Sequence, residues 1–183
     1  MKPATVAAVT AVLVLPAASA SAQEVFAGGF AHALDIKLGA GKEEHGTDVQ
    51  VGVRSAPMRR WKAIGRPRLY LYVSKSLNAR TNFVAGGMLW RHDFSHRLYG
   101  QIGWGLAIHD GAVWASDTHG DPDRTAYGSR VLFESEAGLG LRLGRGWSTE
   151  LTYAHISNAH IWTDVNPGQD KLGLRLVRRF GAR

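Results

Sequence analysis

The 183-residue sequence contains no cysteine. This absence excludes disulfide bonds and any chemistry that needs a thiolate, so stability must come from packing or from a membrane. After the N-terminal segment, the sequence also lacks any run apolar enough for a transmembrane helix, and it has no convincing apolar stripe at helical spacing. If the chain spans a membrane, it must do so as a closed β-barrel, because lipid offers the backbone no hydrogen bonds.

The first 22 residues have the parts of a secretory signal peptide. They start with Met1 and Lys2, continue with an uncharged run rich in Ala, Val and Leu over residues 4–18, and close on small residues that end at Ala22. The apolar run is too short to span a bilayer comfortably. We therefore expect cleavage after Ala22 and a single mature domain over residues 23–183.

Acidic residues are fewer than basic ones, with 15 Asp and Glu against 22 Lys and Arg and a formal net charge of +7. The excess of arginine suits contact with anionic groups such as the phosphates of lipopolysaccharide. Nucleic acid is the competing explanation of basic charge, and the export signal argues against it.

Strand-like segments, in which apolar and polar residues alternate, fill the mature chain. The sequence predicts eight of them, over residues 25–38, 48–54, 68–74, 81–94, 98–109, 129–143, 147–158 and 170–180. Eight is an even number, as expected for a bacterial single-chain barrel with both termini in the periplasm.

The segment 129–143 is the clearest test of what kind of barrel this is. Its apolar residues occupy one face: Val131, Phe133, Ala137, Leu139, Leu141 and Leu143. Its charges occupy the other: Arg130, Glu134, Glu136 and Arg142. About fifteen alternating residues exceed the usual soluble strand of five or six, whereas a tilted strand that crosses a bilayer can project beyond it. Length therefore favours an outer-membrane barrel.

The connections agree with this topology, with one exception. Residues 95–97 and 144–146 are predicted to be short periplasmic turns, and the long polar connection over 111–128 falls outside the cell. Residues 56–66 are too many for a tight periplasmic turn. We expect the second and third strands to extend into them.

A soluble barrel of the lipocalin type, with the apolar face inward, is the structural alternative. The polar face argues against it, because it is crowded with Arg, Glu, Gln, Tyr and Gly. Such residues can fill the narrow interior of an eight-stranded barrel as an ion-paired, hydrogen-bonded plug. The aliphatic face would then meet lipid.

Chemistry is indicated near the C-terminus. His155 and Ser157 are two residues apart on one predicted strand, so their side chains share a face, about 6 to 7 Å apart. Asp170 has the parity of the outward leucines of the next strand, and antiparallel pairing brings it beside His155. A hydroxyl, an imidazole and a carboxylate thus converge at the outer rim. Alternatively, all three are polar rim residues in the headgroup zone.

The residues around this cluster resemble a known family. His155, Ser157, Asn158 and Ala159 form an H-x-S-N-A signature, and residues 166–170 read Asn-Pro-Gly-Gln-Asp. The pattern resembles the lipid A 3-O-deacylases of the PagL type. The resemblance implies an eight-stranded outer-membrane barrel whose exterior site hydrolyses the acyl ester at position 3 of lipid A, with Ser157 as nucleophile and His155 as general base.

Two positions depart from the family pattern. The family's acid is usually glutamate, and Asp170, one methylene shorter, stands there, so a different strand offset is expected. His160 stands where the family often has glycine in the oxyanion region. A backbone N–H does not depend on the side chain, so we expect an oxyanion hole with Asn158 as its side-chain donor, and Asn166 either supports it or shapes the loop.

Two other functions compete with the deacylase. One is a non-enzymatic barrel that acts through its outer loop, and the other is an outer-membrane phospholipase with the same triad. The eight histidines show no tight ligand spacing, so no metal or other cofactor is expected, and His92 and His96 are predicted to be rim residues beside a turn. The expected partner is lipopolysaccharide in the membrane, not nucleic acid; the pattern carries no signal for oligomeric state.

Overall fold

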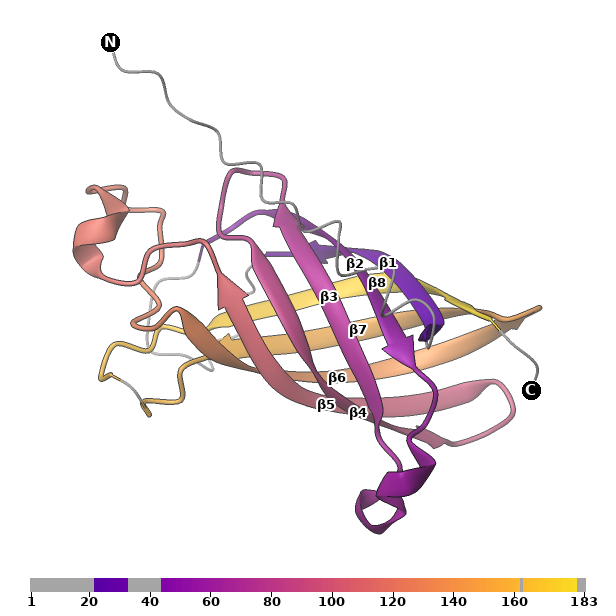
Figure 1. The fold of residues 1–183 in the computed structure, drawn as a ribbon. Helices are drawn as coiled ribbons and strands as arrows, with labels where there is room; N and C mark the ends of the chain where they lie inside the picture. The colour runs from indigo at the N-terminus through magenta and orange to yellow at the C-terminus, as the bar shows by residue number, and fades with distance from the viewer. Residues whose placement is uncertain (1–21, 33–43, 162, 181–183) are drawn as a thin grey trace.

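The eight strands close into one antiparallel β-barrel (Figure 1). The computed structural model describes residues 22–32, 44–161 and 163–180. Its strands are β1 (Ala22–Ala31), β2 (Thr47–Ser55), β3 (Arg68–Ser76), β4 (Phe83–Asp93), β5 (Leu98–His109), β6 (Val131–Gly144), β7 (Trp147–Ser157) and β8 (Gln169–Arg179). Each strand pairs with the next along the chain, and β1 pairs with β8, which leaves no open edge. The prediction of an eight-stranded antiparallel barrel is confirmed.

The connections between strands gather at the two ends of the barrel (Figure 1). The β5–β6 and β7–β8 connections define what we call the loop end, and the short turns at 94–97 and 145–146 define the turn end. Two 3-10 helices are described, η2 (Arg59–Ile64) in the β2–β3 connection and η3 (Ala115–Thr118) in the β5–β6 connection. None of the helices in the described ranges is long and apolar enough to cross a membrane.

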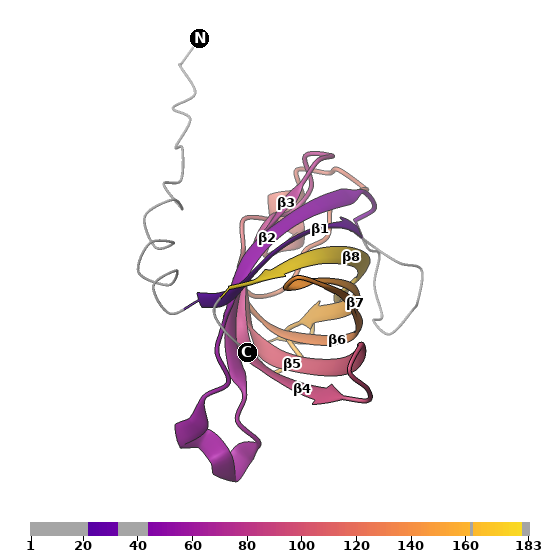
Figure 2. The same ribbon diagram turned by 90° about the vertical axis from the view of Figure 1, so that its right-hand side faces the viewer.

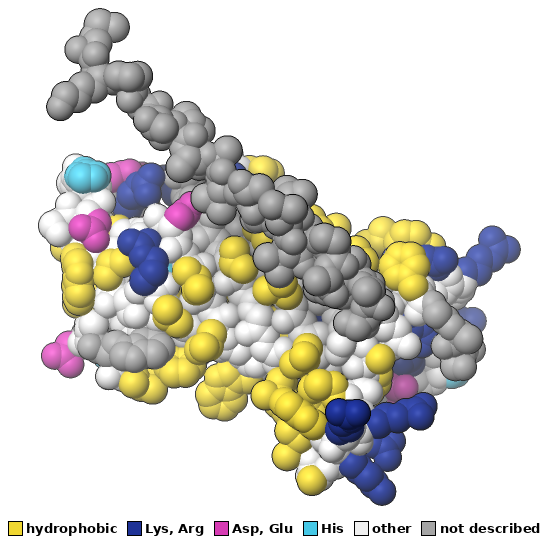
Figure 3. All heavy atoms as spheres, in the orientation of Figure 1, with side chains coloured by type: hydrophobic (Ala, Val, Ile, Leu, Met, Phe, Trp, Pro, Cys, Tyr) yellow, Lys and Arg dark blue, Asp and Glu magenta, His cyan; other side chains and the backbone are white. Residues whose placement is uncertain are grey.

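The two faces of the wall differ as the alternation predicts. Trp104 on the outer face is 66% exposed, whereas Gln101, of opposite parity on the same strand, is 4% exposed. The long strand β6 places Leu139 and Leu141 outside and buries Glu134 and Glu136. On the face that Figure 3 shows, aliphatic and aromatic side chains lie on the barrel wall, whereas the inward positions of the strands carry buried charges such as Glu134 and Glu136. This arrangement is that of a membrane barrel and excludes the lipocalin alternative, whose apolar face would point inward.

Ion pairs and aromatic rings fill the interior. Arg54 donates to both carboxylate oxygens of Glu150 at 2.8 Å each. Arg175 donates to Glu136 at 2.8 Å, and its guanidinium carbon lies 4.7 Å from the centroid of the Phe26 ring. These buried arginines thus each contact a carboxylate, which a buried ion needs if its desolvation is to be offset. The predicted ion-paired plug is confirmed.

Two predicted boundaries need comment. The first strand was expected over residues 25–38, whereas β1 ends at Ala31, and residues 33–38 lie outside the described part. The expectation that the second and third strands extend into residues 56–66 is wrong, because β2 ends at Ser55, β3 begins at Arg68, and η2 lies between them. The signal peptide also lies outside the described residues, apart from Ala22 in β1, and its cleavage stays a prediction.

Candidate active site

The last rungs of the β7–β8 ladder bring the predicted site residues together. His155 pairs with Asp170, and Ile156 pairs with Gln169 in the rung nearest the loop end. Tyr153, His155 and Ser157 share the outward parity of Leu151. Strand register, and not a flexible loop, therefore sets the position of the acid relative to the imidazole.

The imidazole and the carboxylate are in direct contact. The distance from His155 Nδ1 to Asp170 Oδ1 is 2.7 Å, the Asp170 side chain is fully buried, and the His155 side chain is 26% exposed. The two residues are direct cross-strand partners, so aspartate has the reach that this register requires. With Nδ1 held by the carboxylate, Nε2 is the ring nitrogen left for other chemistry.

Tyr153 is a further member of the cluster that sequence reasoning missed. Its hydroxyl donates to the same Asp170 Oδ1 at 2.5 Å. Tyr153 is the cross-strand partner of Leu172, so it reaches Asp170 along the diagonal of the ladder. The signal for it in the sequence is parity, because Tyr153 lies two residues before His155 on the same strand and so shares its face.

Ser157 lies next to this pair but is not hydrogen-bonded to it. It is the last residue of β7, it is 8% exposed, and within the described residues its hydroxyl forms no hydrogen bond with His155. A second hydroxyl lies nearby: Ser135 on β6 is the direct cross-strand partner of His155 and is exposed. The imidazole therefore has one serine on its own strand and one on the neighbouring strand.

The loop after β7 is organised by Asn158. The amide nitrogen of this fully buried side chain donates to the carbonyls of Tyr127 at 3.0 Å and Val165 at 2.5 Å. Its Oδ1 accepts from the His160 N–H at 2.8 Å, and its own N–H donates to Asn166 Oδ1 at 2.9 Å. The amide donor expected to serve an oxyanion is thus engaged with backbone carbonyls. Asn158 and Asn166 hold the loop together.

Two residues of this loop have a backbone conformation that is rare for side chains with a Cβ. The φ angles of Ala159 and His160 are 54° and 56°, in the left-handed region. Glycine adopts this region without strain, whereas Ala159 and His160 are held in it by the contacts of the surrounding loop. The His160 N–H is used within the loop, whereas no described residue accepts a hydrogen bond from the Ala159 N–H.

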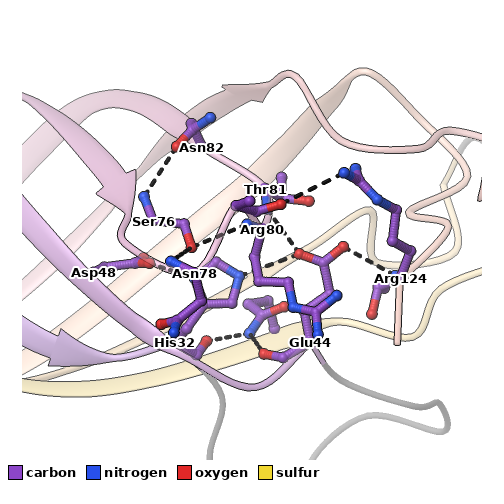
Figure 4. Close-up of polar contacts among 12 residues, drawn as sticks. His32, Glu44, Asp48, Ser76, Asn78, Arg80, Thr81, Asn82 and Arg124 are labelled. Atoms are coloured by element: carbon purple, nitrogen blue, oxygen red, sulfur yellow. Dashed lines mark hydrogen bonds and ion pairs between the residues drawn. The ribbon is translucent and has the colours of Figure 1, made fainter. Parts of the chain in front are cut away.

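Buried polar contacts in the lumen hold the start of β8 from the inner side of the barrel wall. The Tyr127 hydroxyl donates to Gln169 Oε1 at 2.7 Å, and the Gln169 amide donates to the His32 carbonyl. The His32 ring lies between Asp48 at 2.5 Å and Glu44 at 3.4 Å (Figure 4).

Glu44 lies outside the strands and joins three chain segments at the loop end. It accepts hydrogen bonds from the backbone N–H groups of Thr81 at 2.8 Å and Thr125 at 3.1 Å. Burial raises the pKa of Glu44, but the hydrogen bonds from His32 and from these two N–H groups outweigh it and lower the pKa to about 2. The carboxylate is therefore ionised at neutral pH.

An apolar hollow of 630 Å³ on the outer wall begins beside the site. Tyr153 and Leu172 line it next to the Asp170 contact, and it crosses the wall over the small side chain of Ala137 toward Ile102 and Trp90. The described residues include no cluster of His, Asp and Glu arranged to hold a metal ion. His92 is exposed and packs against the Phe94 ring, with ring centroids 5.4 Å apart.

Comparisons with known proteins agree with this architecture. A solved structure described as the outer membrane enzyme PagL matches with a TM-score of 0.61 and 16% identity, covering 85% of this chain and 99% of that one. Neisserial surface protein A matches with a TM-score of 0.54 and 11% identity, covering 86% of this chain and 95% of that one. A designed transmembrane β-barrel matches with a TM-score of 0.50 and 14% identity, covering 87% and 96%. At these identities the likeness shows the fold.

Sequence comparison supplies the family. A search of curated proteins finds no significant match. The family model described as lipid A 3-O-deacylase (PagL), however, matches residues 34–179, which include the whole candidate site. A PagL-like barrel implies the outer membrane as its location. The chain belongs to the lipid A 3-O-deacylase (PagL) family.

Proposed function

We propose that this protein removes the 3-hydroxyacyl chain at position 3 of lipid A with a serine nucleophile on the outer wall of the barrel. The observation that carries the proposal is the His155–Asp170 hydrogen bond of 2.7 Å on the lipid-facing side of β7 and β8, in a chain of the lipid A deacylase family. An imidazole oriented by a carboxylate is the base that a serine needs. Its position on the wall is where the acyl ester of a membrane lipid can reach it.

The steps follow from the proposed roles. Ser157 Oγ bonds to the ester carbonyl carbon while its proton passes to His155 Nε2, and Asp170 stabilises the imidazolium that forms. Breaking the bond to the sugar oxygen then releases the deacylated lipid, and that oxygen takes the proton from His155. Water, deprotonated by the same nitrogen, cleaves the acyl-serine and frees the 3-hydroxy fatty acid. Rotation of the Ser157 side chain toward Nε2 completes the site when substrate binds, as is common for catalytic hydrogen bonds that are long without substrate.

The Ala159 N–H is the oxyanion donor that we assign in place of the Asn158 amide. It follows Asn158 directly, and its strained left-handed conformation is held by the Asn158 and Asn166 contacts on both sides. A fixed N–H costs no reorganisation when negative charge develops on the carbonyl oxygen. Asn158, Asn166 and His160 then act as positioning residues.

The apolar hollow is the place proposed for the acyl chain. It opens beside Tyr153 and is lined by outward apolar side chains that include Ala137 and Leu172. An acyl chain whose ester lies at Ser157 could enter it without leaving the hydrocarbon layer.

Mass spectrometry of lipid A from cells that express the wild type or a variant tests the proposal. We expect the wild type to remove one 3-hydroxyacyl chain and Ser157→Ala to leave lipid A intact. Ser135→Ala is the matched control, because Ser135 lies across from the same imidazole and should not be needed. Activity that persists in Ser157→Ala but disappears in Ser135→Ala would overturn the choice of nucleophile. Intact lipid A with every protein, together with fatty acid released from phospholipid, would indicate a phospholipase. No release from either lipid would indicate a barrel without hydrolase activity.

A further inference from the structure

The β2–β3 connection differs from the other connections at the turn end. It runs over residues 56–67 and contains η2, whereas the turns at 94–97 and 145–146 are short. In Figures 1 and 2 it stands out sideways from the barrel, away from the rest of the wall. The proposed catalytic residues are at the loop end, and of this connection only Gly65 lines the apolar hollow, at the side away from Tyr153.

This segment is strongly basic. It carries Arg59, Arg60, Lys62 and Arg66 and no acidic residue over 56–67. All four side chains belong to exposed residues, and none forms an ion pair with any residue in the described ranges. Elsewhere at this end, Arg142 does pair with an acid, Asp93, at 2.5 Å. The four cations of the β2–β3 connection therefore face outward without a counter-charge from the described part of the chain.

Two large apolar side chains accompany the charges. Trp61 is 40% exposed and Ile64 is 51% exposed. In Figure 3 hydrophobic and basic side chains gather together on the projecting segment. Tryptophan beside Lys and Arg is the composition of segments that lie at a membrane–water interface, where the ring enters the headgroup layer and the cations meet phosphates.

The end of the segment near Ile64 and Gly65 is anchored to the lipid-facing wall. Trp90, on the outer face of β4, donates its indole N–H to the Ile64 carbonyl at 2.6 Å. Met58 N–H donates to the Pro67 carbonyl at 2.9 Å and closes the base of the connection. Gly65 has φ 84°, a conformation strained for any residue with a Cβ, and a Cβ there would also lie in tight contact with the Trp90 ring at 3.2 Å. The connection is thereby held beside the lipid that surrounds the barrel.

We propose that the β2–β3 connection binds the headgroups of anionic phospholipids in the periplasmic leaflet. The proposal rests on the orientation assumed for the proposed function, with the loop end and its active site in the outer leaflet. Arg59, Arg60, Lys62 and Arg66 supply the positive charge, and Trp61 and Ile64 insert beside the acyl chains. The contact fixes the depth of the barrel in the membrane at the end opposite the site.

The absence of cysteine permits a direct test. Ala63→Cys places one thiol on η2, and an environment-sensitive fluorophore on it reports whether the segment is in water or in the interface. The labelled full-length barrel is reconstituted into vesicles of phosphatidylcholine alone and of phosphatidylcholine with phosphatidylglycerol at about 3:1. We expect a blue shift and a several-fold fall in quenching by iodide in the anionic vesicles, both reversed at about 0.5 M salt because screening weakens surface charge.

Matched variants separate the headgroup contact from general insertion. A label at Ser95→Cys, in the short turn at the same end, should stay in water in both kinds of vesicle. Replacement of the four cations by glutamine should abolish the response at position 63 while the barrel still shows the heat-dependent gel migration of a folded protein. Equal fluorescence and quenching in both kinds of vesicle would overturn the proposal, whether the segment inserts without need of anionic lipid or stays in water. A full response from the glutamine variant would also overturn it.

The test is independent of catalysis. A labelled protein that also carries Ser157→Ala should show the same blue shift and the same fall in quenching in anionic vesicles. Failure of hydrolysis and failure of headgroup binding are then separate results.

Discussion

The replacement of Asp170 by asparagine is the most direct test of the catalytic arrangement. Asp170 Oδ1 accepts from His155 Nδ1 at 2.7 Å and from the Tyr153 hydroxyl at 2.5 Å, and the carboxylate is fully buried. Asparagine has nearly the same shape, so the barrel and the register should persist. What it removes is the negative charge that stabilises an imidazolium and the acceptor that fixes the His155 tautomer.

The expected loss can be estimated from this geometry. In a Ser-His-Asp triad the same exchange lowers kcat by about 10⁴-fold. The His155 side chain is 26% exposed here, so water screens part of the lost charge. We therefore expect a fall of about 10³-fold in kcat, which corresponds to ~4 kcal/mol in the barrier, with little change in KM. Asp170→Glu keeps the charge on a longer side chain, and we expect it to stay within about tenfold of the wild type.

The assay follows release of 3-hydroxy fatty acid from lipid A in mixed detergent micelles, over a range of substrate concentrations that separates kcat from KM. Heat-dependent gel migration of each variant controls for folding. An Asp170→Asn protein that is folded and within tenfold of the wild type would refute the role given to Asp170. So would an equal loss in the asparagine and glutamate variants, because only one of them lacks the charge.

Three further outcomes follow from the contacts around the site. Tyr153→Phe removes the second hydrogen bond to Asp170, and we expect roughly a five- to thirty-fold fall in kcat, measured in the same assay, as one charged hydrogen bond is worth about 1 to 2 kcal/mol. Tyr127→Phe removes the hydroxyl that holds Gln169, and we expect a smaller loss of activity together with faster amide exchange in the last rungs of β7 and β8, read by mass spectrometry. Glu44 has its pKa lowered to about 2 in the folded barrel, so its contribution to stability is complete above the ordinary value of 4.5 and is lost as pH falls from there toward 2. Urea unfolding at pH 7 and pH 3 should show a larger acid destabilisation in the wild type than in Glu44→Gln.

The alternation of residue types was sufficient to predict the barrel, because apolar residues at every second position assign one face of each strand to the exterior and the other to the interior. In β6 the sequence places Glu134 and Glu136 on the face opposite Leu139 and Leu141, and the structure buries the acids and exposes the leucines. The same parity predicted that Asp170 would lie beside His155, and their register confirms it. These features depend on strand periodicity and neighbour pairing, both of which can be read directly from the order of residues.

What could not be predicted depends on contacts between distant segments. The Asn158 amide was expected to face an oxyanion, but it donates to the carbonyls of Tyr127 and Val165, and no local pattern indicates that Tyr127 lies beneath this loop. The connection at 56–66 was expected to lengthen two strands, yet Trp90 holds the Ile64 carbonyl from another strand and a 3-10 helix forms instead. Both differences concern irregular backbone, whose hydrogen bonds are made by groups far away in sequence.

The filled interior is a reason to propose that the chemistry takes place on the outside of this barrel. Ion pairs such as Arg54–Glu150 occupy the lumen, so a lipid cannot enter it, and the exterior is the surface that acyl chains already cover. A smooth outer wall, however, gives a catalytic group little support. The β7–β8 ladder supplies that support from within, because the rung after His155–Asp170 is Ile156–Gln169, and the Gln169 side chain points inward to the Tyr127 hydroxyl. Because adjacent residues of a strand point to opposite faces, the buried Gln169 amide holds the position of Asp170 on the exterior. Disturbing the lumen at Gln169 should therefore loosen the contact between Asp170 and His155 on the other side of the wall.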